Sequence, residues 1–374
     1  MKRKGFSEDE NKMKNRSIII IPILIILILF LSGCFEFFSN NDGKVTYQSH
    51  PTKISYEISY GYKINCSGTG KYSIKYNCDI PELINGEISS IITHDENYEE
   101  KILATHNKVK QWDIIDYDSK NYNLGLTAIV ESKSYIVSDL SGSNALNLED
   151  IKNQYPSIVN QFTKAQSNKT TVFINPNDPE IASLANTIKN IADTNNSFIL
   201  AKELFIWLKQ YTSYQIHSNN NVQPADFTLQ CKTGDCDDLS YLYISMCRSI
   251  GIPSRFIRGY LLEGENAISH AWVEVFVGGN IGKSGWIPIE CAGVSEDIKT
   301  EIYQNFGIES AEHLRLFTDD GSNESINVSL ATLYFIKYNP NLLINTESYA
   351  GINNYKELES HELVIDENNL RFYQ

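Results

Sequence analysis

The sequence predicts an α+β fold, in which a core of helices and antiparallel strands follows a β-rich N-terminal domain. Alternating runs typical of strands dominate the early part of the chain, up to about residue 168. Helical periodicity replaces them from about residue 179 to 250, and alternation returns after Gly251. Helices followed by strands indicate an α+β core rather than a doubly wound sheet.

Four segments follow from these changes of pattern. A length of 374 residues suggests two domains, or one large domain with an elaboration, and 42% hydrophobic content is ordinary for a globular chain that can bury a full core. The predicted segments are a leader (1–34), a β-rich N-terminal domain (35–168), the α+β core (169–300) and a C-terminal extension that completes the core (301–374).

The leader has the pattern of an export signal. Basic residues precede an apolar run from Ile18 to Leu31, which is shorter than the roughly 20 residues of a spanning helix. The run ends in Leu31-Ser32-Gly33-Cys34, which resembles a lipobox and would make Cys34 the lipidated first residue of a lipoprotein. The alternative is an uncleaved signal anchor over 17–38. Either way, the chain is expected to be exported and tethered to the outer face of the cytoplasmic membrane through an N-terminal lipid or anchor.

The charge balance argues against a nucleic-acid partner. The formal net charge is −14, and no basic patch interleaved with aromatic residues is visible. The sequence leaves the oligomeric state open.

The β-rich domain is marked by strand-like runs at 55–60, 71–76 and 124–130. Cys66 and Cys78 flank a Gly-rich turn between two such runs. This placement suits a disulfide across a hairpin.

The core begins with two helical stretches, one with apolar residues from Ile181 to Ile191 on one face and one with apolar residues from Ala201 to Leu208. A third helix is predicted after Gly234-Asp235-Cys236-Asp237-Asp238. It should stop at Gly251, because glycine takes the left-handed conformation and Pro253 cannot continue a helix. Cys236 therefore lies at a helix N-terminus, where the helix dipole should lower the thiol pKa toward neutrality.

Three strands are predicted after this helix, at 254–261, 269–277 and 286–290. The glycines at 278–282 can close a hairpin between the second and the third. A hairpin centred on Asn280 places His270 opposite Glu290, and opposed residues share one face of a sheet. A carboxylate beside an imidazole can fix its tautomer and stabilise the imidazolium. From Ser295 on, apolar residues suggest a further helix and a strand at 331–336.

Four ordered blocks resemble the transglutaminase-like superfamily: residues 234–240, 248–260, 270–275 and 285–290. The resemblance covers roughly 175–295 and implies a papain-like α+β core that transfers acyl groups through a thioester. It implies Cys236 as the nucleophile, His270 as the base and Glu290 as the orienting acid. The family's acid is usually Asp, so the third role departs from the pattern, with Asp237 and Asp238 as alternative acids.

The expected substrates are amides of peptides or proteins, cleaved by a peptidase or amidase or used in cross-linking. The sequence does not separate hydrolysis from transfer to an amine. Gln230 has the spacing of the oxyanion glutamine in papain-like proteases, and Tyr214 is a weaker candidate for that role. The rival hypothesis is an inert transglutaminase-like module for binding or assembly on the cell surface.

With Cys34 and Cys236 given other roles, the remaining core cysteines are Cys231, Cys247 and Cys291. Cys231 and Cys291 lie beside the expected site and could pair to brace it, which leaves Cys247 as a buried thiol. A zinc site from Cys231, Cys236 and His270 is disfavoured, because the two cysteines are five residues apart and no second paired motif exists. No metal and no cofactor are expected.

Overall fold

The computed structural model describes residues 38–39, 44–95, 97–166, 171–216, 222–295, 297–322 and 333–374. The predicted leader, including Cys34, lies outside these residues. In the part of the chain that is described, no helix is both long and apolar enough to cross a membrane.

A β-sandwich forms the larger all-β part of the structure. Its two sheets share one hydrophobic core that includes Ile58, Tyr76, Trp112 and Leu124. The first sheet has the order β18 (Leu343–His361), β3 (His50–Ser67), β8 (Lys120–Lys133) and β5 (Gly86–Thr93). The second has the order β17 (Leu333–Lys337), β4 (Tyr72–Asp79), β7 (Lys108–Asp116) and β6 (Glu99–Ile102).

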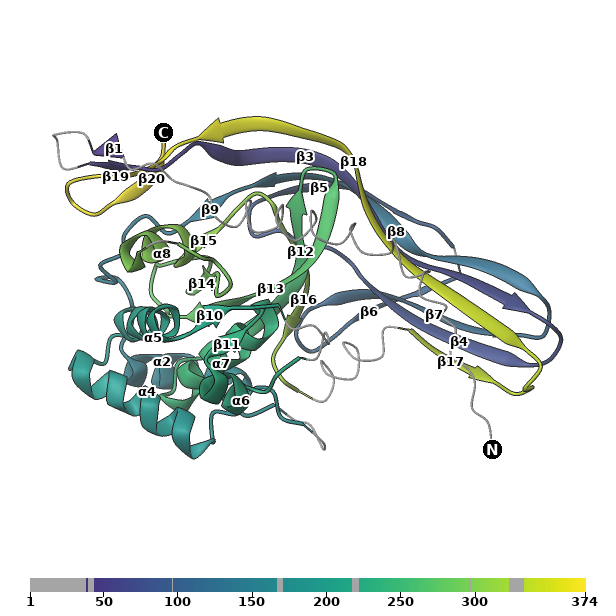
Figure 1. Cartoon of the computed structure of the whole chain (residues 1–374), viewed down its shortest axis with the longest axis horizontal. Helices are drawn as coiled ribbons and strands as arrows, with labels where there is room; N and C mark the ends of the chain where they lie inside the picture. Colours follow the sequence, from purple (N-terminus) through teal and green to yellow (C-terminus); the bar gives the residue numbers. More distant parts are fainter. Residues whose placement is uncertain are drawn as a thin grey trace, which may run out of the picture. The chain divides into compact units, whose positions relative to one another are not determined.

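The C-terminal segment is shared between the two parts of the fold. Strand β16 (His313–Asp319) joins the sheet of the α+β core, whereas β17 pairs with β4 and β18 pairs with β3. The two long strands β3 and β18 run side by side in Figure 1, in purple and yellow. The prediction that all of 301–374 completes the core is therefore wrong for β17 and β18. Pairing between strands almost 300 residues apart leaves no mark in local sequence pattern.

The predicted disulfide between Cys66 and Cys78 is also absent, and both are buried free thiols. The Gly-rich turn carries the chain from β3 in one sheet to β4 in the other. It does not close a hairpin. Facing sheets lie about 10 Å apart, which is further than two Cα atoms that a disulfide can join.

The α+β core is built on an antiparallel sheet with helices around it, as the order of helices and strands predicts. The sheet order is β14 (Trp286–Ile289), β13 (Asn266–Phe276), β12 (Ser254–Glu263) and β16. The helices are α4 (Pro179–Ala192), α5 (Ser197–Tyr211), α6 (Ala225–Cys231), α7 (Cys236–Ser249) and α8 (Ile298–Asn305). Figure 1 shows α4, α5, α6 and α7 gathered together. The α+β fold class, with a β-rich N-terminal region, is confirmed.

Helix α7 packs its apolar face against the sheet. Leu242, Tyr243 and Met246 share a hydrophobic cluster with Val273 and Val275 of β13. Gly251 ends the helix as predicted, with a φ of 90° that an L side chain rarely adopts.

The predicted start of the core at residue 169 is too late. Helices α2 (Leu148–Gln154) and α3 (Pro156–Phe162) lie in the segment assigned to the β-rich domain. Their residues Ile151 and Phe162 pack with Phe276 and Trp286 of the core sheet.

Short strand pairs complete the structure. Strand β9 (Tyr135–Ile136) pairs with β15 (Ile308–Glu309), and β10 (Ser213–Tyr214) runs parallel to β11 (Thr233–Gly234). A small sheet contains β1 (Phe38–Ser39), β2 (Val45–Thr46), β19 (Leu363–Ile365) and β20 (Arg371–Tyr373).

Candidate active site

Cys236 is the first residue of α7, and a capping box fixes the turn before it. The Asp235 side chain accepts hydrogen bonds from the backbone amides of Asp237 and Asp238, and the Asp238 carboxylate accepts one from the Asp235 amide at 3.2 Å. Asp238 is further held by Gln223, whose backbone and side-chain nitrogens donate to it at 2.6 and 2.9 Å. The Asp238 carboxylate therefore supports the start of the helix.

His270 and Glu290 lie together, although the hairpin register differs from the expected one. Strand β13 pairs Val273 with Ile289 and Phe276 with Trp286, so the hairpin is centred one residue later than Asn280. Moving the centre by one residue shifts the partner of His270 by two positions. Because side chains alternate with a period of two, Glu290 stays on the face of His270.

The hydrogen bonds around Glu290 hold the imidazole in place. The Nε2 atom of His270 lies 2.7 Å from Oε2 of Glu290, and the backbone amide of Ala292 donates to Oε1 at 2.7 Å. His270 also hydrogen-bonds the Cys236 thiol. Since Glu290 occupies Nε2, the nitrogen left for the thiol is Nδ1. The structure thus brings Cys236, His270 and Glu290 into one hydrogen-bonded series.

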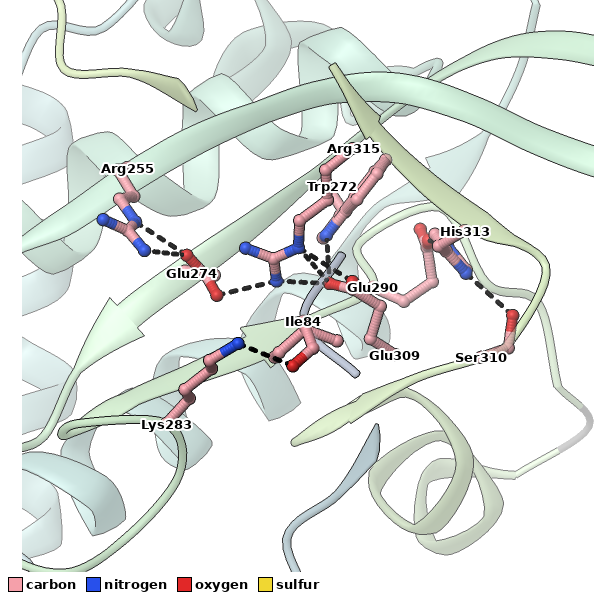
Figure 2. A network of polar contacts seen from close by, with 10 residues as sticks. All are labelled: Ile84, Arg255, Trp272, Glu274, Lys283, Glu290, Glu309, Ser310, His313 and Arg315. Carbon is pink, nitrogen blue, oxygen red and sulfur yellow. Dashed lines mark hydrogen bonds and ion pairs between the residues drawn. The ribbon is translucent and has the colours of Figure 1, made fainter. Parts of the chain in front are cut away.

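A second histidine, which sequence reasoning did not single out, shares the same carboxylate. His313 at the start of β16 places Nε2 3.2 Å from Oε2 of Glu290, and its Nδ1 lies 2.8 Å from the Ser310 hydroxyl. Its ring packs edge-on against Trp272, with centroids 4.8 Å apart. Figure 2 shows the contact between His313 and Ser310, with Glu290 close by. No motif marks His313, because only tertiary structure brings β16 to this site.

The electrostatics of the site differ from the expectation for a helix N-terminus. Burial raises the pKa of the Cys236 thiol, the charge of Asp237 adds to the rise, and the hydrogen bond with His270 opposes it only in part. The predicted fall of the thiol pKa toward neutrality is therefore wrong, because burial raises the pKa more than the interactions with His270 lower it. Burial also raises the pKa of Asp237, to about 6.

The imidazole behaves in the opposite way to most buried histidines. Burial disfavours its charged form, yet the charge of Glu290 and the hydrogen bonds with Cys236 and Glu290 raise the pKa of His270 to about 10. For Glu290, burial opposes ionisation, but His270 and then His313 hold the carboxyl pKa below its usual range. The site therefore favours an imidazolium paired with a carboxylate.

Gln230 and Tyr214, the two candidates for the oxyanion donor, differ in their position relative to Cys236. Gln230 is exposed on α6 and is not among the residues that line the cleft at Cys236, so the structure does not bring it to the thiol. Tyr214 pairs in register with Gly234, two residues before Cys236. Burial, followed by the nearby Cys236, raises the pKa of the Tyr214 hydroxyl, which keeps it a hydrogen-bond donor.

The predicted pair of Cys231 and Cys291 does not form. Cys231 is exposed at the end of α6, whereas Cys291 is buried in the core behind β14. Cys247 is a buried thiol on the apolar face of α7. Burial raises the pKa of all four buried thiols, Cys66, Cys78, Cys247 and Cys291, so they are not reactive under ordinary conditions.

Metal-ligand atoms converge at one place among the described residues. One atom each from His270, Glu290 and His313 lies within 4.8 Å of the others. Nε2 of His270 and Nε2 of His313 both hydrogen-bond Oε2 of Glu290. The Ser310 hydroxyl hydrogen-bonds Nδ1 of His313, and the Ala292 amide donates to Oε1 of Glu290. The arrangement can hold protons between the two imidazoles and the carboxylate.

A second polar cluster lies farther along β13. Glu274 accepts from Arg255 Nε at 2.6 Å and from Arg315 Nη2 at 2.7 Å. Arg315 also pairs with Glu309, which accepts from the Trp272 indole at 2.8 Å. Figure 2 shows Arg315 between the two carboxylates. These charges are buried and mutually paired.

Comparison with known proteins identifies the region that carries this site. Residues 183–291 match the transglutaminase-like superfamily. The chain is 28% identical over 123 residues to the uncharacterized protein YebA of Bacillus subtilis (strain 168), and 38% identical over 72 residues to the uncharacterized protein ML0607 of Mycobacterium leprae (strain TN). These stretches cover 28% and 17% of this chain, but only 16% and 24% of the two relatives.

A solved structure extends the likeness to most of the fold. A "Putative Cysteine Protease" from Cytophaga hutchinsonii superposes with a TM-score of 0.51 at 16% identity, over 87% of this chain and all of that one. This likeness concerns the fold. The family match, the α+β core and the helix that begins at Cys236 agree, and the chain therefore contains a transglutaminase-like superfamily domain.

Proposed function

We propose that this chain is a cysteine-dependent enzyme that cleaves or transfers the acyl group of a peptide or protein amide through a thioester on Cys236. The observation that carries the proposal is the placement of His270 between the Cys236 thiol and the Glu290 carboxylate, 2.7 Å from the latter. An imidazole oriented by an acid beside a thiol at a helix start is the arrangement that nucleophilic acyl transfer requires.

The Cys236 thiol and the His270 imidazolium together hold two protons, and one of them must be lost to solvent before the substrate is attacked. The proton that remains is then held by His270, and the Cys236 sulfur, as a thiolate, forms a bond to the amide carbonyl carbon. The carbonyl oxygen becomes an oxyanion, for which the backbone amide of Cys236 and the Tyr214 hydroxyl are the candidate donors. The C–N bond breaks, His270 gives its proton to the leaving amine, and a thioester remains.

The second half of the reaction determines the product. Water attacking the thioester yields an acid, and an amine yields a new amide; either attack releases the thiol, with the proton returning through His270. The proposal includes both outcomes. It also places the enzyme outside the cytoplasm, tethered to the outer face of the cytoplasmic membrane, on the strength of the basic and apolar pattern of residues 1–34.

The test is mass spectrometry of a peptide mixture incubated with a primary amine and either wild type or Cys236→Ala. A loss of amide nitrogen with addition of water indicates hydrolysis, and addition of the amine indicates transfer. The proposal predicts one of these products for wild type and neither for Cys236→Ala. Products from both proteins, or from neither, contradict the proposal, and the second result favours the inert binding module.

A further inference from the structure

Cys236 lines a cleft that is formed by the α+β core together with the β-sandwich. The cleft has a volume of about 690 Å³. Cys236, Asp237 and His270 lie on its core side. Residues of β3, β4 and β18 lie on the other side, so the β-sandwich provides a second wall, called the sandwich wall below.

Specific contacts hold the sandwich wall against the core. Asp79 at the end of β4 pairs with Arg258 of β12 at 2.7 Å. The Glu82 amide donates to the Arg315 carbonyl at 2.9 Å. Lys283 donates to the carbonyl of Ile84 at 2.7 Å, a contact drawn in Figure 2. The cleft is therefore formed by the folded chain itself.

Aromatic residues dominate the sandwich wall. Tyr62 and Tyr76 pack edge to face with centroids 5.3 Å apart, and Tyr60 packs in the same way on Tyr260 of the core at 5.8 Å. Tyr349 of β18 also lines the cleft. The faces of such rings attract cations, most strongly where water is excluded.

The charges of the lining carry the same preference. Three carboxylates, those of Asp79, Asp235 and Asp237, line the cleft against two cations, Arg258 and the His270 imidazolium, and the imidazolium is already paired with Glu290. Asp79 is only 6% exposed, and its Oδ2 accepts from Arg258. Its Oδ1 is buried and has no hydrogen-bond partner among the described residues. An unpaired buried acceptor is costly, so a donor from a bound molecule would relieve it.

We infer that the sandwich wall is a binding subsite for a cationic side chain, lysine or arginine, next to the amide that the enzyme attacks. Tyr60, Tyr62 and Tyr76 would surround the cation, and Oδ1 of Asp79 would accept a hydrogen bond from it. This inference rests on the proposed function and adds the substrate class. It also gives the β-sandwich a role in selecting substrate.

The test uses two peptide chloromethyl ketones that are identical except for lysine or norleucine beside the ketone. Each alkylates the Cys236 thiol with loss of chloride, and intact mass with peptide mapping gives the rate. Wild type should react roughly tenfold faster with the lysyl compound, as a charge-assisted hydrogen bond implies. The preference should fall to about threefold or less in Asp79→Asn, whereas Asp113→Asn, an exposed position in the same sandwich, should keep it.

A second variant avoids the risk that a change at buried Asp79 impairs folding. Ser348 is exposed on β18 and lines the cleft, so Ser348→Lys places a cation on the sandwich wall. This variant should lose the preference for the lysyl compound, and Ser360→Lys, also exposed on β18 but outside the cleft lining, should retain it.

The outcomes separate this inference from the proposed function. Equal rates for the two ketones in wild type, or a preference unchanged in both Asp79→Asn and Ser348→Lys, overturn the cationic subsite alone. Equal rates together with protection of Cys236 by tetra-N-acetylchitotetraose, which carries no charge, would overturn the cationic subsite and assign the tyrosines to a neutral sugar instead. If neither ketone modifies Cys236 in wild type, the proposed function fails and the inference fails with it.

Discussion

Two carboxylates of the core, the buried Glu274 and the partly buried Glu290, differ in the kind of partner that holds them. Glu274 lies between Arg255 and Arg315, which stay charged at any ordinary pH, and despite the opposing effect of burial these arginines hold its pKa at about 2. Glu290 lies between His270 and His313, which can gain or lose a proton. A carboxylate between arginines stabilises a fold, and one between imidazoles can take part in chemistry.

The largest effect that separates the two carboxylates is expected for Glu290→Gln. Glutamine has nearly the same size but no charge, so it cannot hold the His270 imidazolium or fix the tautomer. Amide turnover should fall by roughly 10²- to 10⁴-fold. Steady-state kinetics on the product found in the peptide and amine mixture measures this. The control is a urea denaturation curve that shows the variant to be folded under the assay conditions. Turnover within threefold of wild type would remove Glu290 from the catalytic set.

Glu274→Gln should have the opposite profile. Loss of the carboxylate leaves Arg255 and Arg315 short of a buried partner, which should lower the free energy of unfolding by about 3 kcal/mol. Urea denaturation followed by tryptophan fluorescence measures this. The rate at which iodoacetamide labels Cys236 should stay near that of wild type at 25 °C. A large fall in labelling without a loss of stability would show that the two clusters are not separate in function.

The pH dependence of Cys236 labelling in wild type tests the proton equilibrium of the site at Glu290, where the partners are imidazoles. The pKa of Cys236 is raised, and that of His270 is raised to about 10. A group with a raised pKa keeps its proton to a higher pH, so the reactive form, which lacks one proton, appears only under alkaline conditions. The iodoacetamide rate should rise by about tenfold per pH unit above neutrality until the pair has lost that proton. A plateau already reached below pH 7 would contradict these pKa shifts.

A smaller effect is expected at His313, which acts through Glu290 and is a positioning residue. His313→Ala removes the contacts to Glu290 and Ser310 and should lower turnover by roughly 3- to 10-fold. It should also shift the pH limb, which is the rising part of the curve of iodoacetamide labelling rate against pH. His313→Gln keeps a donor for the carboxylate and should recover much of the loss. If both variants lower stability but leave the pH limb in place, the role of His313 is only structural.

The smallest effect, and one of opposite sign, is expected for Asp237→Asn. The negative charge of Asp237 raises the pKa of the neighbouring thiol. Its removal should shift the pH limb to lower pH and speed labelling at pH 7.5 by roughly 2- to 5-fold. Asp113→Asn is the matched control for loss of one charge. A slower reaction in Asp237→Asn would mean that this carboxylate assists the thiol.

Local patterns were sufficient to predict the helix that begins at Cys236 and the strand that carries His270. Apolar residues at a spacing of three and four define α7, and a turn glycine ends it. The hairpin centre was misplaced by one residue, but the period of two kept Glu290 on the correct face. Such features depend on neighbours in sequence, so the sequence records them.

The features that the sequence did not predict depend on distant contacts or on burial. Pairing of β18 with β3 and the position of His313 join segments that are far apart in the chain. The sequence predicts a lowered thiol pKa, whereas burial raises it. The burial of Cys236 depends on packing that no local pattern reveals. The same applies to Cys66 and Cys78, which are divided between two sheets.

The most direct test of the central claim is to trap the acyl group on Cys236. Wild-type protein is mixed with an excess of a peptide p-nitrophenyl ester and quenched in acid within the first turnover, and the chain is mapped by mass spectrometry. The account predicts one acyl adduct on Cys236, removed by hydroxylamine as a thioester is, and absent in Cys236→Ala. An adduct on another residue, or no adduct at all while the ester is consumed, would contradict it.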